Sequence, residues 1–290
     1  MSTHLLVPAS SRIRAAAIIA PGLLLVVAAP VWAHHSEKHF KVDPHPVVTI
    51  HNPSGTITVK AWTKQEVMVM ADNSDAVQIM AEQTGNRVDI MSDEVSTGNT
   101  PGDLRADYQV NVPEDAELQI HDDSGAVSVA NVNGDMNVET IEAGVGMADT
   151  GGYLTVSTVG GSFQCLRCAG RIEVKSISGN IRLEDLRSYD VHAQTSSGNI
   201  IFNGQFMPNG SYRLKNYSGV IEVRFSPGDS FDLTATSLKG QVNNEAKLEP
   251  THHGFLPRMG NSLIGSFNAG RARVEATSFN GTINILKRGD

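Results

Sequence analysis

The stretch that decides the fold runs from Gly170 to Val223 and reads, unit by unit, Gly170-Arg-Ile-Glu-Val, Gly179-Asn-Ile-Arg-Leu, Gly198-Asn-Ile-Ile-Phe, Gly210-Ser-Tyr-Arg-Leu and Gly219-Val-Ile-Glu-Val. Each unit begins with a turn glycine, and the second and fourth residues after that glycine are apolar or aromatic. A third apolar position lies two residues before the glycine, as in Ile177 and Tyr217. We expect all three positions to face the core. Self-similarity at a short period is typical of a repeat architecture.

These units predict short strands and corners rather than helices. Apolar residues two apart fit the alternation of a strand, and no helical stretch separates the units, which excludes a βαβ sheet. Hairpins packed as a sandwich or barrel are the alternative. Units with equivalent inward positions favour coils stacked in parallel, with two units per coil. We therefore predict an all-β, parallel β-solenoid-like stack of Gly-x-Ile-x-Val units.

The same strand pattern extends on both sides of the repeat and defines the domain organisation. Residues 34–120 read as an N-terminal β-strand section that caps the stack, and residues 121–290 as the solenoid repeats. A long Pro-, His- and Gly-containing stretch predicts a loop insertion at 244–270. We expect 34–290 to be one continuous domain, with the polar, histidine-rich residues 34–43 as a flexible terminus.

Residues 1–33 have the features of a secretory signal. A basic start precedes an apolar run over 15–29, and Val31-Trp32-Ala33 places small residues at a cleavage site. A membrane anchor is the alternative, but the run is shorter than the roughly 20 residues that a spanning helix needs, and Pro21-Gly22 interrupts it. We expect cleavage after Ala33 and no stable membrane span afterwards.

The charge of the exported chain limits its partners. Residues 34–290 contain 21 basic and 31 acidic residues, which gives a formal charge of −10. Nucleic acid requires a basic footprint and is therefore excluded as a partner. The same charge argues against simple electrostatic docking on anionic lipid.

The two cysteines of the chain, Cys165 and Cys168, form a C-x-x-C motif inside the repeat. In an oxidising compartment the expected state is a disulfide, and the repeat places both residues inward. Buried thiols are the other structural reading. A thioredoxin-like redox site would need the first cysteine at a helix N-terminus, and two cysteines are too few for a structural zinc site.

No catalytic, cofactor-binding or metal-binding residues are predicted. The adjacent acidic pairs inside the repeat, Asp122-Asp123 and Glu184-Asp185, lie where turns are expected, and there aspartate forms local hydrogen bonds. His252-His253 falls in the predicted loop and could bind a metal with one more ligand, but a solvated loop is the expected reading. No calcium-repeat pattern, nucleophile elbow or phosphate-binding loop is present. Asn180 and Asn199, each directly after a turn glycine, are expected to stack as a side-chain ladder.

The order of these elements resembles the DUF4097 family of adhesin-like, or toastrack, β-strand repeat proteins over roughly residues 40–287. The motifs that carry the resemblance are Val47-Val-Thr-Ile, Ser54-Gly-Thr-Ile-Thr-Val-Lys-Ala-Trp62, Val110-Asn-Val-Pro113, the serial Ser-Gly-x-Ile units and Asn280-Gly-Thr-Ile-Asn-Ile. The resemblance implies a β-solenoid-like stack in exported or membrane-tethered bacterial proteins, some of them in envelope-stress systems. No catalytic residues are established for the family, so none are carried over.

From these observations we expect a non-enzymatic, exported protein of the cell envelope with an adhesin-like binding or scaffolding role. Its location would be periplasmic, on the outer surface or secreted, and its partner an envelope protein, peptide or glycan. The alternative is an envelope-stress sensing module that binds a peptide, lipid or partner protein. A glycan-active β-helix enzyme is a third reading, and it would need a cluster of carboxylates on a solvent-facing groove.

Overall fold

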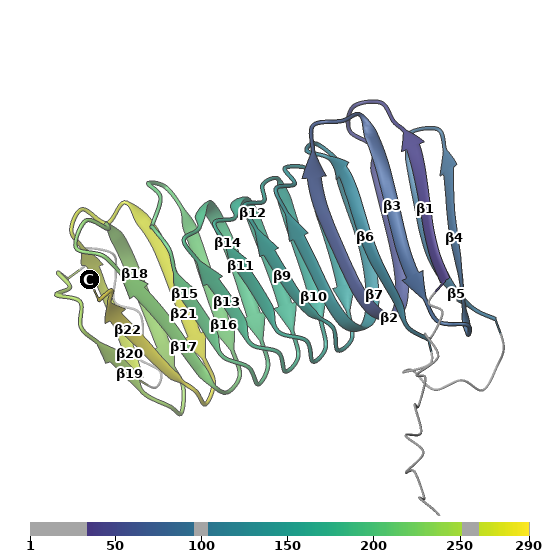
Figure 1. The fold of residues 1–290 in the computed structure, drawn as a ribbon. Helices are drawn as coiled ribbons and strands as arrows, with labels where there is room; N and C mark the ends of the chain where they lie inside the picture. Colours follow the sequence, from purple (N-terminus) through teal and green to yellow (C-terminus); the bar gives the residue numbers. More distant parts are fainter. Residues whose placement is uncertain (1–33, 96–103, 251–260, 290) are drawn as a thin grey trace, which may run out of the picture. The chain divides into compact units, whose positions relative to one another are not determined.

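The computed structural model describes residues 34–95, 104–250 and 261–289 (Figure 1). The predicted signal segment and His252-His253 lie outside these ranges. Within them, every regular element is a β-strand, and the strands β1 to β22 are hydrogen-bonded into one sheet. The all-β prediction is confirmed. No helix that could span a membrane occurs in the described part of the chain.

The strands of the central region form two walls (Figure 1). The first wall contains, in stacking order, β8 (Met136–Thr140), β10 (Tyr153–Thr158), β12 (Ala169–Ser176), β14 (Arg187–Thr195) and β16 (Ser211–Asn216). The second wall contains β9 (Gly144–Ala148), β11 (Phe163–Leu166), β13 (Ile181–Glu184), β15 (Ile200–Asn203) and β17 (Val220–Phe225). All of these pairings are parallel, and successive strands alternate between the walls. Two units therefore make one coil, as predicted, and equivalent residues of successive coils lie next to one another along the stack.

The N-terminal section surrounds two long strands that run through both walls. Its strands are β1 (His34–Lys41), β2 (Val47–Trp62), β3 (Glu66–Asn73), β4 (Val77–Thr84), β5 (Arg87–Glu94), β6 (Ala106–Pro113) and β7 (Glu117–Ala130). β2 pairs with β7 in parallel along nearly its whole length. β3 pairs antiparallel with β1 and β6, and β4 with β5. The expectation of a flexible terminus at residues 34–43 is wrong, because all eight residues of β1 pair with β3.

At the other end, the stacking order departs from the sequence order. The last strands are β18 (Phe231–Ser237), β19 (Val242–Asn244), β20 (Asn261–Phe267), β21 (Ala272–Ser278) and β22 (Thr282–Lys287). β21 lies between β16 and β18, and β22 lies between β17 and β19. The final coil of the chain is therefore inserted between two earlier coils.

The expected loop insertion at 244–270 is wrong for residues 261–267. They form β20, which pairs antiparallel with all seven residues of β18 and covers the end of the first wall. The pairing satisfies backbone groups that β18 would otherwise leave open, which explains why this stretch becomes a strand despite its irregular sequence pattern.

The corner glycines are explained by the close approach of neighbouring coils. A Cβ atom on Gly179 would lie 1.9 Å from the carbonyl oxygen of Gly161, the equivalent glycine one coil earlier. The predicted asparagine ladder is confirmed beside it. The backbone N–H of Asn199 donates to Asn180 Oδ1 over 2.9 Å, and the N–H of Val220 donates to Asn199 Oδ1 over 2.8 Å. These side chains link three coils along the stack.

The alternation of inward and outward side chains along β12 corrects the expected position of the third core residue. In β12 the buried residues are Ile172, Val174 and Ser176, and Ile177 is 57% exposed. Ser176 Oγ accepts a hydrogen bond from the N–H of Gly179 over 2.7 Å. The third inward position is thus three residues before the glycine, where a hydroxyl satisfies the corner amide. The prediction that Ile177 and Tyr217 face the core is wrong, because the inward residue in each case is the one before it, Ser176 or Asn216.

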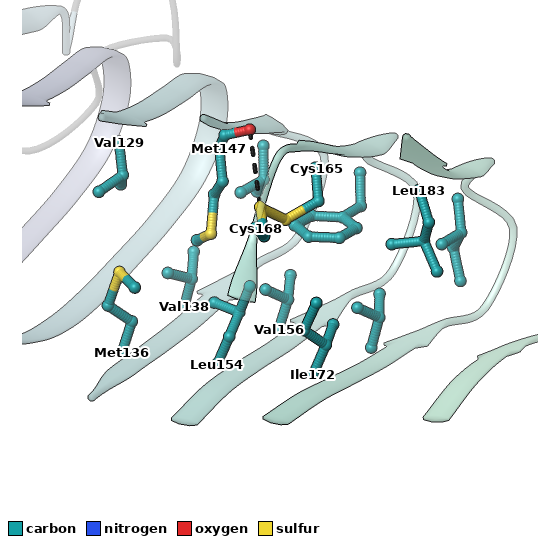
Figure 2. Close-up of a cluster of buried hydrophobic side chains, with 14 of the residues drawn as sticks. Val129, Met136, Val138, Met147, Leu154, Val156, Cys165, Cys168, Ile172 and Leu183 are labelled. Atoms are coloured by element: carbon teal, nitrogen blue, oxygen red, sulfur yellow. Dashed lines mark hydrogen bonds between the residues drawn. A yellow bond between two sulfur atoms is a disulfide. The ribbon is translucent and has the colours of Figure 1, made fainter. Parts of the chain in front are cut away.

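At the opposite corner the residue two before the glycine does face inward. There Cys168 is joined to Cys165 by a disulfide, and both side chains are fully buried (Figure 2). Figure 2 shows the bridge among the apolar side chains of neighbouring coils, close to Met147. Cys165 belongs to strand β11 and not to a helix N-terminus, so the geometry that the redox reading required is missing at this position.

Candidate binding groove

The residues at the corner between the first and second walls form a row on the surface. Backbone hydrogen bonds join this corner in successive coils: for example, the N–H of Ser196 donates to Ile177 O over 3.1 Å, and the N–H of Tyr217 donates to Ser196 O over 3.2 Å. We call this row the ridge. In stacking order it contains Ile141, Val159, Ile177, Ser196, Tyr217, Phe279 and Leu238. All except Ser196 are apolar or aromatic, although the row lies at the surface.

A groove runs beside the ridge along the first wall. Its other side is the row of outward residues two positions before each ridge residue, which includes Glu139, Ser157, Lys175, Gln194, Lys215, Thr277 and Thr236. The groove contains two hollows. A hollow of about 300 Å³ lies along Ile141, Val159 and Ile177, and one of about 480 Å³ lies along Ser196, Tyr217 and Phe279. We call them the aliphatic hollow and the aromatic hollow.

Two stacked rings form one side of the aromatic hollow. The rings of Tyr217 and Phe279 have centroids 4.7 Å apart and planes only 7° from parallel. Lys239 Nζ lies 4.9 Å from the centroid of Phe279 and covers that ring from the next coil. The Tyr217 side chain is 58% exposed, and its coil neighbour on the side away from Phe279 is the small Ser196. One face of the tyrosine is therefore held by stacking, and the other borders a notch in the ridge.

An amide without a partner lies in the core beneath the aromatic hollow. The equivalent inward residues Thr195, Ser237 and Ser278 each accept a hydrogen bond from a corner glycine N–H, over 3.2, 3.0 and 2.8 Å. Asn216 occupies the same position in its coil. Both its Oδ1 and Nδ2 atoms are buried, and neither has a hydrogen-bond partner among the described residues. Such a buried group costs stability unless an ordered water satisfies it.

The charge in the aromatic hollow differs from that of the chain as a whole. Lys215 is the single charged residue among the described residues that line it, whereas the whole chain has a formal charge of −8. Two coils earlier in the same row, Lys175 Nζ lies 2.7 Å from Glu173. Lys215 makes no ion pair within the described ranges. Burial, and then the charge of Arg213, lower the pKa of nearby His192.

The acidic pairs considered from the sequence do not form a carboxylate cluster. Glu184 is paired with Arg182 over 3.0 Å, and Asp185 lies at a corner with φ of 50°. Asp122 was expected at a turn, which is wrong: it lies within β7 and is fully buried. Its Oδ1 accepts a hydrogen bond from Asn52 Nδ2 over 3.2 Å, and burial raises its pKa to about 7. It therefore lies in the core, out of reach of a ligand in the groove.

The histidines of β1 are paired with carboxylates of the same section. His35 Nδ1 lies 2.8 Å from Asp72, and His39 contacts both Glu37 and Glu66, whose hydrogen bonds raise its pKa. In the described ranges, no group of three or more histidine, cysteine or acidic side chains is arranged to hold a metal ion.

Sequence reasoning missed Tyr217 and Phe279 as neighbours. They are 62 residues apart and meet because the final coil is inserted beside β16 and β17. A signal was present in the recurring corner motif, with Ser, Thr or Asn three residues before the glycine, as in Asn216-Tyr-Ser-Gly219 and Ser278-Phe-Asn-Gly281. Those inward polar residues imply that the residue that follows each of them points outward.

The chain is similar to a known protein family and to several solved structures. The family model described as Toastrack DUF4097 matches residues 43–286. Solved structures that resemble the chain include a putative cell adhesion protein from Clostridium sporogenes, with 16% identity, a TM-score of 0.22 and coverage of 88% of this chain and 100% of that one. A putative adhesin from Bacteroides fragilis has 12% identity, a TM-score of 0.40 and coverage of 89% and 99%. No curated protein matches the chain.

Proposed function

The chain belongs to the Toastrack DUF4097 family, and we propose that it is a non-enzymatic, exported cell-envelope protein that binds or scaffolds an envelope component through its corner groove. The observation that carries this proposal is the ridge. Its apolar side chains recur at the same corner over successive coils, and several are about half exposed. Contiguous exposed apolar surface beside a groove is characteristic of interaction sites.

The chemistry of the groove supports binding rather than catalysis. Hydroxyl and apolar side chains make up most of the lining of both hollows, and these groups hold a ligand without activating it. The aliphatic hollow is also lined by His121 and Glu139, which contact each other over 3.7 Å. The carboxyl group whose pKa burial raises to about 7, that of Asp122, lies in the core and not in the groove. General acid–base catalysis needs such a group within hydrogen-bond reach of the reacting atoms.

Export is supported by two features that are independent of each other. Residues 1–33 have the composition of a cleavable signal, and the buried Cys165–Cys168 disulfide fits an oxidising compartment, since cytosolic thiols are kept reduced. N-terminal sequencing of the protein from envelope or culture fractions should find His34 as the first residue. Retention of residues 1–33 would contradict the signal peptide and indicate a tethered protein.

The binding role is tested by removing apolar surface from the ridge. A variant with Ile141, Val159 and Ile177 all changed to Asn should lose retention of mature protein on isolated envelope material. The matched control is Tyr189→Ser, which removes a side chain that is 61% exposed at the opposite end of β14. Since all four positions are exposed, both variants should fold. Equal retention of the two variants and the parent would overturn the assignment of binding to the ridge.

A further inference from the structure

We propose that the aromatic hollow binds an acidic oligosaccharide, with one sugar ring seated against Tyr217 in the notch above Ser196 and its anionic group paired with Lys215. This inference rests on the proposed binding function and names the ligand class for one part of the groove. It depends on the shape of the notch, on the polar groups beside it and on the charge of its lining.

The dimensions of the notch fit one ring. Ile177, Ser196 and Tyr217 occupy three successive coils, which are linked by backbone hydrogen bonds. Neighbouring strands are about 4.8 Å apart, so Ile177 and Tyr217 are separated by roughly 9–10 Å across the small serine. A ring in van der Waals contact on both faces needs about twice the carbon–carbon contact distance of 3.5–4.0 Å, or about 7–8 Å. The notch therefore accepts a single ring between Ile177 and Tyr217.

The tyrosine is positioned in advance for stacking. Phe279 lies parallel to it on the far side, and Lys239 in turn covers Phe279, so the Tyr217 ring has little freedom to tilt. The face of an aromatic ring is electron-rich and attracts the polarised C–H groups on one face of a pyranose. Because the ring is already held, little conformational entropy is lost on binding.

The polar groups beside the ring match a sugar better than an acyl chain or a peptide. The outward amide of Gln194 and the exposed hydroxyl of Ser196 offer both donors and acceptors to the hydroxyl groups of a sugar. An acyl chain would cover the Gln194 amide and the Ser196 hydroxyl without satisfying them. A peptide strand adds to an open sheet edge, whereas the strands beneath the hollow are paired on both sides by their neighbouring coils.

The charge of the hollow selects an acidic sugar. Lys215 is unpaired within the described part of the chain and is flanked along the stack by Gln194 and Thr277, which carry no charge. None of the described residues that line the hollow is a carboxylate. A uronate, sialate or sulfate group would give Lys215 the partner that Glu173 gives Lys175. Neutral sugars would keep the ring contact and lose this ion pair.

The test is an array of immobilised oligosaccharides that bear uronate, sialate or sulfate groups, each beside a neutral counterpart with the same backbone. The mature protein should bind at least one acidic glycan more tightly than its neutral counterpart, and the preference should weaken as salt is added. Titration calorimetry with the best soluble acidic oligosaccharide should show Tyr217→Ala to weaken binding about tenfold. Lys215→Gln should reduce the preference for the acidic over the neutral form, and Tyr189→Ala should bind like the parent.

Binding to neutral glycans alone, or to no glycan, would overturn the proposal, as would equal affinity of Tyr217→Ala and the parent. Thermal melts of each variant show whether a loss arises from misfolding, and Tyr217→Phe, which preserves stacking, should retain binding if the ring contact is the cause. If the array is negative while the ridge variant still loses envelope retention, the ligand class is wrong and the proposed function stands. If both are negative, the proposed function fails as well.

Discussion

Replacing Asp122 by asparagine should remove a strong pH dependence of the stability. Asp122 is fully buried in β7. Its Oδ1 accepts a hydrogen bond from Asn52, and its Oδ2 has no partner among the described residues. Burial, opposed in part by the hydrogen bond from Asn52, raises the pKa of the carboxyl group to about 7 from its ordinary value of 3.8. The folded protein therefore keeps this group protonated at pH values where the unfolded chain has ionised it.

The sign and size of the effect follow from linkage. Below about pH 4 both states bind the proton, and the contribution of the neutral carboxyl group is fully present. Between about pH 4 and pH 7 the folded state binds more protons than the unfolded state, so the free energy of unfolding falls as pH rises. The difference between about 7 and 3.8 corresponds to a loss of about 4 kcal/mol, at about 1.36 kcal/mol for each pKa unit.

Urea unfolding curves of the parent and Asp122→Asn from pH 4 to pH 8 measure this loss. Asparagine has nearly the same shape and does not ionise. The stability of the variant relative to the parent should therefore rise by about 4 kcal/mol across this range. Asp123→Asn, at the partly exposed neighbouring residue, is the control and should show no comparable rise. Parallel pH profiles for Asp122→Asn and the parent would refute the buried, protonated carboxyl group.

Further predictions concern the coils and the disulfide. Ile181→Asp should unfold the stack or disrupt neighbouring coils, because it buries an unpaired charge at a site that is 1% exposed. Arg182→Asp, at an outward position, should change the stability by only roughly 0.5 kcal/mol in thermal melts. Equal losses of stability in the two variants would mean that the inward register is wrong. Val274→Asp in the inserted coil should lower the melting temperature about as much as Ile181→Asp. A small decrease, as expected for a substitution in a frayed chain terminus, would contradict the insertion. Cys165→Ala should lower the free energy of unfolding by about 2 kcal/mol, the chain-entropy value for so short a loop, and rapid thiol labelling of the native parent would contradict the disulfide.

The regular part of the fold could be predicted because a single short-range rule governs it. Alternation along each strand and a glycine at each corner place Ile181 and Leu183 inward, and their neighbours in β11 and β15 follow by stacking. Ile177 was misplaced because its apolar character was taken as a sign of burial, although the alternation along β12 turns this residue outward. A hydroxyl buried at a corner is favourable there only because a specific amide donates to it, and this information is absent from a hydrophobic pattern.

The candidate site could not be predicted, because it depends on which coils are neighbours rather than on what each coil contains. Local pattern shows that Tyr217 and Phe279 occupy equivalent corners, but the pairing of β21 with β16 is a non-local event that a periodic sequence leaves open. Asp122 presents a similar case. A carboxylate beside a second acidic residue reads as a solvated turn until β2 and β6 are known to cover it.

The insertion of the last coil links the integrity of the groove to the completion of folding. Before β21 and β22 enter, β16 and β17 present an open edge, and the coil of β18 and β19 has nothing to stack on. Tyr217 then lacks the parallel ring of Phe279 that holds it, and Lys239 lacks the ring over which it lies. In a repeat protein whose C-terminal residues form the outermost coil of the stack, loss of that coil removes only contacts with one neighbouring coil. Here the final residues of the chain supply an interior coil and one half of the aromatic pair, so a chain shortened before Arg271 should lose both its C-terminal stability and its aromatic hollow.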